Sequence, residues 1–141
     1  MVLHVRDVMS RDVHTVKRND ELAIADALMK QERVRHLPVL DEDGRVCAVV
    51  SQRDLFRGAL LRALGYGARA EDLMLRQVPV KDTMSSEIHT TTPDMLVADA
   101  ARLMIDRRVG CLPVIENERL VGIVTETDFV ELVAANSAEK G

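Results

Sequence analysis

The sequence repeats itself, and this repetition constrains the fold more than any other feature. The segment Val5 to Ser10 is similar to Val80 to Ser85, which lies 75 residues further along the chain. After a contraction by one residue, Val49 to Asp54 matches Ile123 to Asp128 at a spacing of 74. Self-similarity at a nearly fixed spacing over most of a 141-residue chain indicates a tandem duplication.

Each copy predicts the same order of elements. A short extended segment precedes a helix with apolar residues at helical spacing, and two β-branched runs joined by a polar turn precede a second helix. The first copy has these elements at Val13 to Val16, a helix start at Asn19-Asp20, His36 to Leu40, Val46 to Val50 and a helix start at Ser51. The second copy has them at Ile88 to Thr91, Pro93-Asp94, Cys111 to Ile115, Leu120 to Val124 and Thr125.

These patterns predict a mixed α/β (α+β) fold of two β-α-β-β-α repeats. One repeat buries too little surface alone, so the two are expected to pack about a pseudo-twofold axis. The expected domains are residues 1–58 for the first repeat, 59–79 for a helical linker, 80–136 for the second repeat and 137–141 for a tail.

Composition excludes several classes of protein. The net charge is −4, with 19 basic and 23 acidic residues interspersed, so nucleic acid is not an expected partner. The longest apolar runs have five residues, too few to cross a membrane. Without an export signal, Cys47 and Cys111 are expected to be reduced thiols in a cytoplasmic protein.

The best candidate site is the turn where each repeat's last strand meets a helix. Ser51 and Asp54 mark this turn in the first copy, and Thr125 and Asp128 mark it in the second. A hydroxyl and free N–H groups at a helix start favour a phosphate oxygen. A carboxylate three residues later suits two hydroxyls of a ribose, because it accepts two hydrogen bonds.

The same spacing has a purely structural interpretation. Ser or Thr followed three residues later by an acidic residue is typical of a capping box, which satisfies the helix's own donors. Its presence in both copies discriminates little, because duplication copies caps as well as binding sites. Spacing alone therefore leaves both interpretations open.

The ordered motifs resemble those of a CBS-domain pair, also called a Bateman module. They comprise the Asp-Val-Met-Ser and Asp-Thr-Met-Ser openings, the Arg-Val-Arg-His-Leu-Pro-Val and Arg-Val-Gly-Cys-Leu-Pro-Val centres and the Ser/Thr-x-x-Asp ends. The resemblance covers residues 5 to about 134. It implies a stand-alone regulatory module without catalysis that binds AMP, ADP or ATP, or sometimes S-adenosylmethionine, in two clefts between the copies.

The resemblance also assigns site residues. It gives Asp54 and Asp128 the ribose, and gives Ser51 and Thr125 a place beside ribose or phosphate. It also implies nucleotide contacts at three further sets of equivalent positions. These are Lys17 and Thr92 after the first strand, Arg35, His36 and Cys111 before Leu-Pro, and Arg53 and Thr127 within the last motif.

The two copies differ in basic residues at these positions. Arg35, His36 and Arg53 of the first copy correspond to Gly110, Cys111 and Thr127 of the second, and Thr92 corresponds to Lys17. An arginine fork suits phosphate oxygens better than a hydroxyl does. The pocket that Arg35, His36 and Arg53 serve is therefore expected to prefer ligands of higher charge.

Other candidates carry less chemistry. His14 and His89 repeat, but no Cys, Asp or Glu lies at a short ligand spacing from them, so no metal site is expected. No nucleophile motif or glycine-rich phosphate loop is present, so no catalytic residue is predicted. The basic doublets at residues 17–18 and 107–108 are expected to be solvated.

Two functions remain open from sequence. The first is a regulatory module that binds an adenine nucleotide and signals to a separate effector protein or through a homodimer. The second is a constitutive dimerisation or interaction protein with no bound nucleotide. The expected dimer surfaces are the apolar stripes of Ala59 to Leu64 and Val130 to Ala135.

Overall fold

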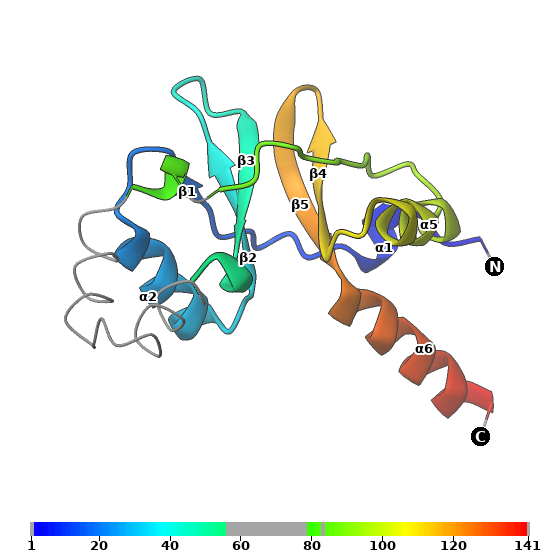
Figure 1. The fold of residues 1–141 in the computed structure, drawn as a ribbon. Coiled ribbons are helices and arrows are strands. Elements are labelled where there is room, and N and C mark those ends of the chain that lie inside the picture. Colours follow the sequence, from blue (N-terminus) through cyan, green and yellow to red (C-terminus); the bar gives the residue numbers. More distant parts are fainter. Residues whose placement is uncertain (1, 56–78, 83, 141) are drawn as a thin grey trace. The chain divides into compact units, whose positions relative to one another are not determined.

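A computed structural model describes residues 2–55, 79–82 and 84–140 of the chain (Figure 1). The chain forms two compact units. We call His14–Ile88 the middle unit, and Met1–Val13 together with His89–Gly141 the terminal unit. Both units combine a β-hairpin with helices, so the predicted mixed α/β fold is confirmed.

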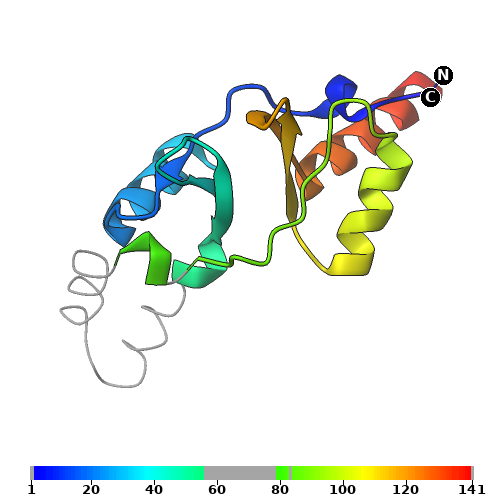
Figure 2. The same cartoon turned by 90° about the horizontal axis from the view of Figure 1, so that it is seen from above.

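The middle unit contains a three-stranded sheet. Strand β1 (Val16–Lys17) runs parallel to β2 (His36–Leu40), and β2 pairs antiparallel with β3 (Val46–Ser51). Helix α2 (Leu22–Glu32) connects β1 to β2 and lies on one side of the sheet (Figures 1 and 2). A short 3-10 helix, η2 (Val80–Asp82), completes the unit.

The terminal unit is built around the hairpin of β4 (Cys111–Glu116) and β5 (Arg119–Thr125). Its helices are α1 (Val5–Val8), α5 (Val97–Arg107) and α6 (Glu126–Lys140). Both ribbon views show these helices on the same side of the hairpin (Figures 1 and 2). α6 includes residues 137–140 of the segment that was expected to be a tail.

The two hairpins agree with the sequence patterns to within one residue at each strand end. The extended segments before the helices are shorter than expected. Before α2 the strand is limited to Val16 and Lys17, and before α5 the described segment has an isolated parallel bridge of Thr91 with Val114. The length difference between copies falls in the hairpin turns, where Gly44, Asn117 and Glu118 adopt positive φ angles.

The predicted helix starts are wrong by one to three residues. Glu21 occupies the N-cap position of α2 and Leu96 that of α5, neither with a side-chain capping hydrogen bond, so both helices begin after the expected Asn19-Asp20 and Pro93-Asp94. The Asp20 carboxylate instead accepts the Lys17 N–H at 2.8 Å. A short acidic side chain that binds backbone ahead of it stabilises a turn, and this turn delays the helix.

The opening segment of each repeat packs in the unit formed mainly by the other repeat. In the terminal unit, Val5 N–H donates to Met95 O at 2.8 Å, and Ser10 and Ile123 exchange two backbone hydrogen bonds of 2.9 Å. In the middle unit, the equivalent Val80 N–H donates to Asp20 O at 2.8 Å. The chain thus crosses over twice between its two units, as the colours of Figure 1 show.

The exchanged segments contribute to both cores. Val5 and Val80 are fully buried, each in the hydrophobic cluster of the unit that it joins. Gly122 leaves room for the exchange, because a Cβ there would lie 2.9 Å from Ser10 O and 2.7 Å from Met9 Sδ. Each unit therefore depends on residues that are distant in sequence.

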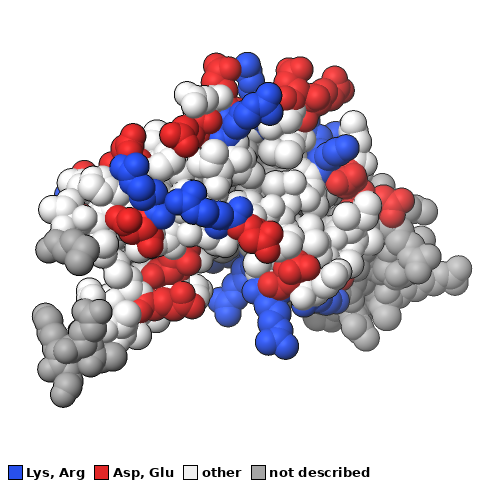
Figure 3. Space-filling view, turned by 180° about the vertical axis from the view of Figure 1, so that it is seen from behind, with Lys and Arg blue, Asp and Glu red and all other residues white. Residues whose placement is uncertain are grey.

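The surface carries mixed charge. On the face shown in Figure 3, basic and acidic side chains are interspersed, as the sequence composition indicated. Among the described residues, every helix is too short or too polar to cross a lipid bilayer.

Candidate ligand-binding turns

The candidate turns lie where each hairpin ends. Ser51 is the last residue of β3 and pairs with His36, and Thr125 is the last residue of β5 and pairs with Cys111. A helical segment begins immediately after each of them. Strand pairing thus places the start of each helix beside the first residue of the hairpin's first strand, which is His36 of β2 or Cys111 of β4.

Both aspartates bind back to the start of their helix. Asp54 Oδ2 accepts the Ser51 N–H at 2.7 Å and the Ser51 hydroxyl at 3.2 Å. Asp128 Oδ2 accepts the Thr125 N–H at 2.7 Å and the Thr125 hydroxyl at 3.4 Å. The carboxylate half of a capping box is therefore formed in both units.

Capping leaves part of each carboxylate available. All of these hydrogen bonds end at Oδ2, and Oδ1 of Asp54 and of Asp128 accepts none from the residues that the structure describes. Both aspartates are half-buried. Since a carboxylate oxygen has two acceptor sites, the same side chain can cap its helix and accept a ligand hydroxyl.

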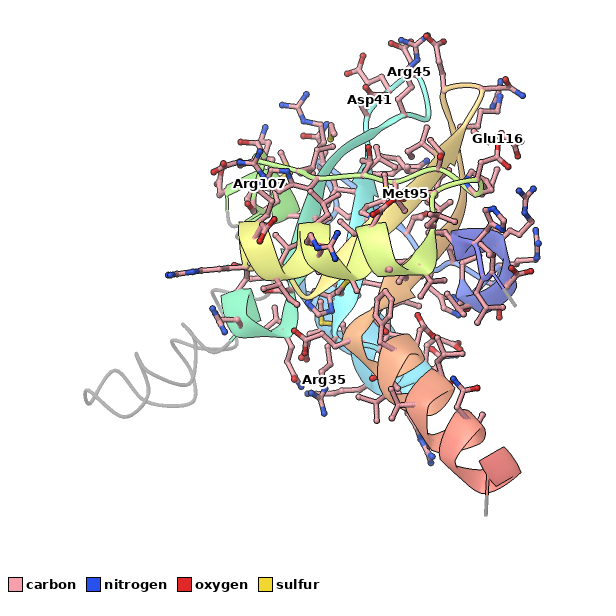
Figure 4. The ribbon with its side chains drawn as sticks, turned by 90° about the vertical axis from the view of Figure 1, so that its right-hand side faces the viewer. Arg35, Asp41, Arg45, Met95, Arg107 and Glu116 are labelled. Carbon is pink, nitrogen blue, oxygen red and sulfur yellow. The ribbon has the colours of Figure 1, made fainter. Side chains whose placement is uncertain are left out.

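A backbone hydrogen bond ties the loop before each hairpin to the turn. Gln52 N–H donates to Arg35 O at 2.7 Å, and Glu126 N–H donates to Gly110 O at 3.3 Å. In the middle unit this bond brings Arg35 to the end of the sheet that carries the turn. Figure 4 shows Arg35 at the opposite end of that unit from Asp41 and Arg45.

The predicted phosphate contacts of the middle unit gather at this end of its sheet. Arg35 and Arg53 are exposed, and His36 is half-buried. The terminal unit brings Cys111, Thr125, Thr127 and Asp128 to the equivalent place. Its turn has no basic residue at the positions of Arg35, His36 and Arg53, so the asymmetry expected from sequence is present in the local structure.

Lys17 and Thr92 lie elsewhere in their own units. Lys17 pairs with Leu40 at the far end of β2 from His36. Thr92 follows the bridge of Thr91 to Val114 and is exposed. Neither is brought to the turn of its own unit, and their contact with a nucleotide stays a prediction.

No metal centre emerges at the repeated histidines. His14 Nε2 lies 3.3 Å from Glu32 Oε2, and a search of the described residues finds no group of three or more His, Cys, Asp or Glu side chains placed to hold an ion.

The two cysteines differ in accessibility. Burial raises the pKa of the Cys111 thiol from 9.0 to about 12, so it is protonated and neutral at physiological pH. Burial also raises the pKa of the Cys47 thiol, with a smaller opposing effect of Arg18, and Cys47 is only half-buried. The Cys111 side chain is therefore small, neutral and buried.

This difference predicts the order of alkylation. At pH 8, iodoacetamide is expected to modify Cys47 faster than Cys111, because the thiolate is the nucleophile and Cys111 has almost none. As the pH rises above 9, the alkylation of Cys47 should accelerate before that of Cys111. The protonated Cys111 stabilises the fold fully below pH 9, and this stabilisation is lost as the pH rises toward 12. Equal alkylation rates in peptide mass maps would contradict the assigned burial.

Comparison with known proteins decides the family. The model of the CBS domain matches residues 5–60 and 80–135, which are the two copies of the repeat. The chain belongs to the CBS-domain family. The predicted tandem CBS pair is thereby confirmed, and the turns described above lie inside both matched segments.

Other CBS proteins match over nearly the whole CBS pair. The CBS domain-containing protein YhcV of Bacillus subtilis is 35% identical over 125 residues, which are 89% of this chain and 81% of YhcV. The structure of AcuB from Vibrio cholerae has a TM-score of 0.76 and 31% identity, covering 99% of this chain and 95% of AcuB. The structure of CBSX2 in complex with AMP has a TM-score of 0.75 and 26% identity, covering 96% and 98%.

Some relatives are longer than this CBS pair. The chain spans 44% of MJ1225 from Methanocaldococcus jannaschii, at 30% identity. It spans 24% of the homoserine O-acetyltransferase of Methanosphaerula palustris, at 31% identity. In these proteins the matching region is therefore joined to further sequence.

Sequence analysis missed the environment of one basic doublet. Lys17 and Arg18 are exposed, as expected, and both also line a cavity together with Lys81, which was not predicted from the sequence. A signal was present in the repeat itself, because the second copy has Thr92 and Pro93 at the positions of this doublet.

Proposed function

We propose that this CBS pair is a non-catalytic regulatory module that binds an adenine nucleotide of the AMP, ADP or ATP type. The observation that carries the proposal is Oδ1 of Asp54 and of Asp128, which accepts no hydrogen bond from the described residues and lies beside a hydroxyl at a helix start. The similarity to CBSX2, which binds AMP, supports an adenosine-containing ligand. The nucleotide acts as a regulatory ligand, and the separate effector protein is not identified.

Each residue has a chemical role in this proposal. The aspartates accept hydrogen bonds from ribose hydroxyls, and Ser51 and Thr125 contact ribose or phosphate. Arg35, His36 and Arg53 favour phosphate oxygens because they supply cationic donors. The neutral Cys111 thiol and the Thr127 hydroxyl suit a less charged part of a ligand. Lys17 and Thr92 are kept as further contacts.

Calorimetric titration with adenosine, AMP and ATP tests the proposal. Asp54→Ala and Asp128→Ala are each expected to weaken binding by about tenfold to a hundredfold, since a hydrogen bond to a charged group contributes about 1.5–3 kcal/mol. Asp99→Ala is the control, because Asp99 is exposed on α5 and pairs with Arg102 on the same helix. Unchanged affinity in both aspartate variants, or no binding by the parent, would reject the proposal.

The melting temperature of each variant without ligand separates the loss of the helix cap from the loss of ligand binding. Asp→Ala removes a capping group worth about 1 kcal/mol, whether or not a ligand binds there. Asp54→Asn and Asp128→Asn keep an oxygen that accepts the backbone N–H. These Asn variants should retain most of the stability of the fold but bind the nucleotide more weakly.

The expected asymmetry of the sites has its own variant. Arg53→Ala should weaken the binding of ATP more than the binding of adenosine, because of these two ligands only ATP has phosphate oxygens for the guanidinium. An equal effect on the two ligands would remove Arg53 from the phosphate site.

The carboxylate capping hydrogen bonds of Asp54 and Asp128 favour one alternative, a constitutive interaction protein without a nucleotide. Thermal melting separates the two functions. A ligand that binds the native state raises the melting temperature with its concentration. A melting temperature that no adenosine compound raises supports the alternative.

We also propose that the CBS pair forms a homodimer through α6. Val130 is 67% exposed and Val133 is 65% exposed, one turn apart on this helix. The other expected surface, Ala59 to Leu64, lies outside the described residues. Large apolar side chains on one helix face are typical of a protein interface.

Sedimentation velocity tests the dimer. The parent is expected to sediment as a dimer and Val130→Glu/Val133→Glu as a monomer, because a dimer would bury four unpaired carboxylates. Val2→Glu is the matched control, as Val2 is equally exposed (67%) but lies outside α6. A monomeric parent, or an unchanged double variant, would contradict the assignment.

A further inference from the structure

The middle unit contains a cavity of about 380 Å³ at the end of its sheet opposite to the Ser51 turn. Three separate segments line it: the end of β1 with the loop that follows, the end of β2 with the hairpin turn that follows, and η2. The lining residues are Lys17, Arg18, Asn19, Asp20, Leu40, Asp41, Glu42 and Lys81. The site is therefore formed by one unit, with Lys81 supplied by the exchanged segment.

Backbone hydrogen bonds hold the basic residues of this cavity together. Lys81 N–H donates to Arg18 O at 3.0 Å, and the neighbouring Val80 N–H donates to Asp20 O at 2.8 Å. Lys17 N–H donates to the Asp20 carboxylate at 2.8 Å. The main chain thus fixes three cationic residues around one cavity, although Lys81 lies more than 60 positions from the other two.

Three basic and three acidic side chains line the cavity, and two of the carboxylates accept backbone hydrogen bonds. Within the described part of the chain, the charged groups of Lys17, Arg18 and Lys81 form no ion pair or hydrogen bond. The Asp20 carboxylate accepts the Lys17 N–H. Asp41 Oδ1 accepts the N–H groups of residues 43 and 45 at 2.9 and 3.0 Å. Glu42 is the third acidic residue and is exposed.

The terminal unit has no such set of cations at the equivalent place. There, Thr92, Pro93 and Asp94 replace Lys17, Arg18 and Asn19, and Arg6 replaces Lys81. The Arg6 guanidinium forms an ion pair with the Asp94 carboxylate. The duplication has therefore diverged here: the terminal unit has an arginine paired with an aspartate, and the middle unit has three cations that form no ion pair with any residue that the structure describes.

We propose that this cavity binds a phosphoryl group, held by Arg18, Lys81 and Lys17. Arginine offers a planar pair of donors to phosphate oxygens, and the two ammonium groups supply charge. The group can belong to a nucleotide or to a free inorganic polyphosphate, and the chemistry of recognition is the same. The proposal is independent of Asp54 and Asp128, which define the proposed nucleoside contacts.

The test is titration of the full chain with tripolyphosphate, ATP and adenosine, followed by calorimetry. Arg18→Gln and Lys81→Gln are each expected to weaken the binding of the phosphate-bearing ligand, tripolyphosphate or ATP, by about tenfold. The reason is the loss of a charge-assisted hydrogen bond. Lys30→Gln is the control, because Lys30 is exposed on α2 and pairs with Asp26. Glu42→Gln should strengthen binding, since it removes a negative charge from the rim.

The ligands distinguish the sources of the phosphoryl group. Weaker tripolyphosphate binding in Lys81→Gln supports a site for free polyphosphate. Weaker ATP binding, with no tripolyphosphate binding by the parent, supports the phosphates of a nucleotide. The proposal is overturned if Lys81→Gln and Arg18→Gln bind both compounds as the parent does. Adenosine binding should not change in either variant, so failure here leaves the nucleoside contacts unaffected.

Cys47 provides a second readout that locates the anion. Arg18 lowers the pKa of the Cys47 thiol against the larger effect of burial. An anion bound to Arg18 should cancel this effect and slow the alkylation of Cys47, while Cys111 in the other unit is unaffected. Unchanged alkylation of Cys47 at saturating tripolyphosphate would place the anion elsewhere and reject the site.

Discussion

A fragment of residues 14–88 is expected to unfold cooperatively, whereas a fragment of equal length, residues 5–79, is expected to lack a cooperative transition. The first fragment is one complete compact unit. The second follows the sequence repeat, and it leaves out the segment that contains Val80 and Ser85. Urea denaturation followed by circular dichroism measures the difference.

The physical reason is the loss of the exchanged segment. Val80 is fully buried in the middle unit, and burial of a valine contributes about 1.5–3 kcal/mol. The segment also makes backbone hydrogen bonds from Val80 to Asp20 and between Ser85 and Val49, each contributing about 1 kcal/mol. Such a sum is a large part of the 5–15 kcal/mol that stabilises a typical domain.

The two fragments control for each other, because they have the same length and share residues 14–79. Val80→Ala in the 14–88 fragment should give an intermediate stability. Equal stability of the 14–88 and 5–79 fragments would show that the exchanged segment does not stabilise the middle unit.

Leu112→Ala is expected to destabilise the terminal unit by about 2–5 kcal/mol. Leu112 is fully buried on β4, in a cluster that contains Val5, Ala100 and Val124. Truncation leaves a cavity among these side chains. Hydrogen exchange should show the largest loss of protection in β4, β5 and α5, because the core of the middle unit is a separate cluster.

Two variants bracket this prediction. Leu37→Ala is the repeat equivalent and should reduce protection in β2, β3 and α2. Ile105→Ala changes a side chain on α5 that is 75% exposed, and it should alter stability by less than about 0.5 kcal/mol. Equal loss of protection in both units for Leu112→Ala and Leu37→Ala would contradict the separation of the two cores.

The candidate turns show both the strength and the limit of sequence analysis. The spacing from Ser51 to Asp54 predicted a helix start, and the capping hydrogen bonds confirm it. Spacing could not decide whether capping uses the whole carboxylate. Only atomic positions show that one oxygen caps the helix and the other accepts no bond from the described residues.

The helix starts show why local signals compete. Asn19-Asp20 has the composition of a helix start, but the Asp20 side chain binds the Lys17 N–H and forms a turn instead. Both arrangements satisfy the same kind of donor within a few residues. The choice depends on β1 and on the exchanged segment, since Asp20 O also accepts the Val80 N–H.

The sequence by itself determined the duplication, the two hairpins and the capped turns, because these features depend on residues a few positions apart. Only the tertiary structure decided which core receives each opening segment, which cations meet at the cavity and how deeply Cys111 is buried. Those features depend on contacts between residues far apart in the sequence, such as Arg6 and Asp94, which are 88 positions apart. Local sequence patterns do not indicate such contacts. Burial and backbone pairing across such separations are set by the packing of whole elements.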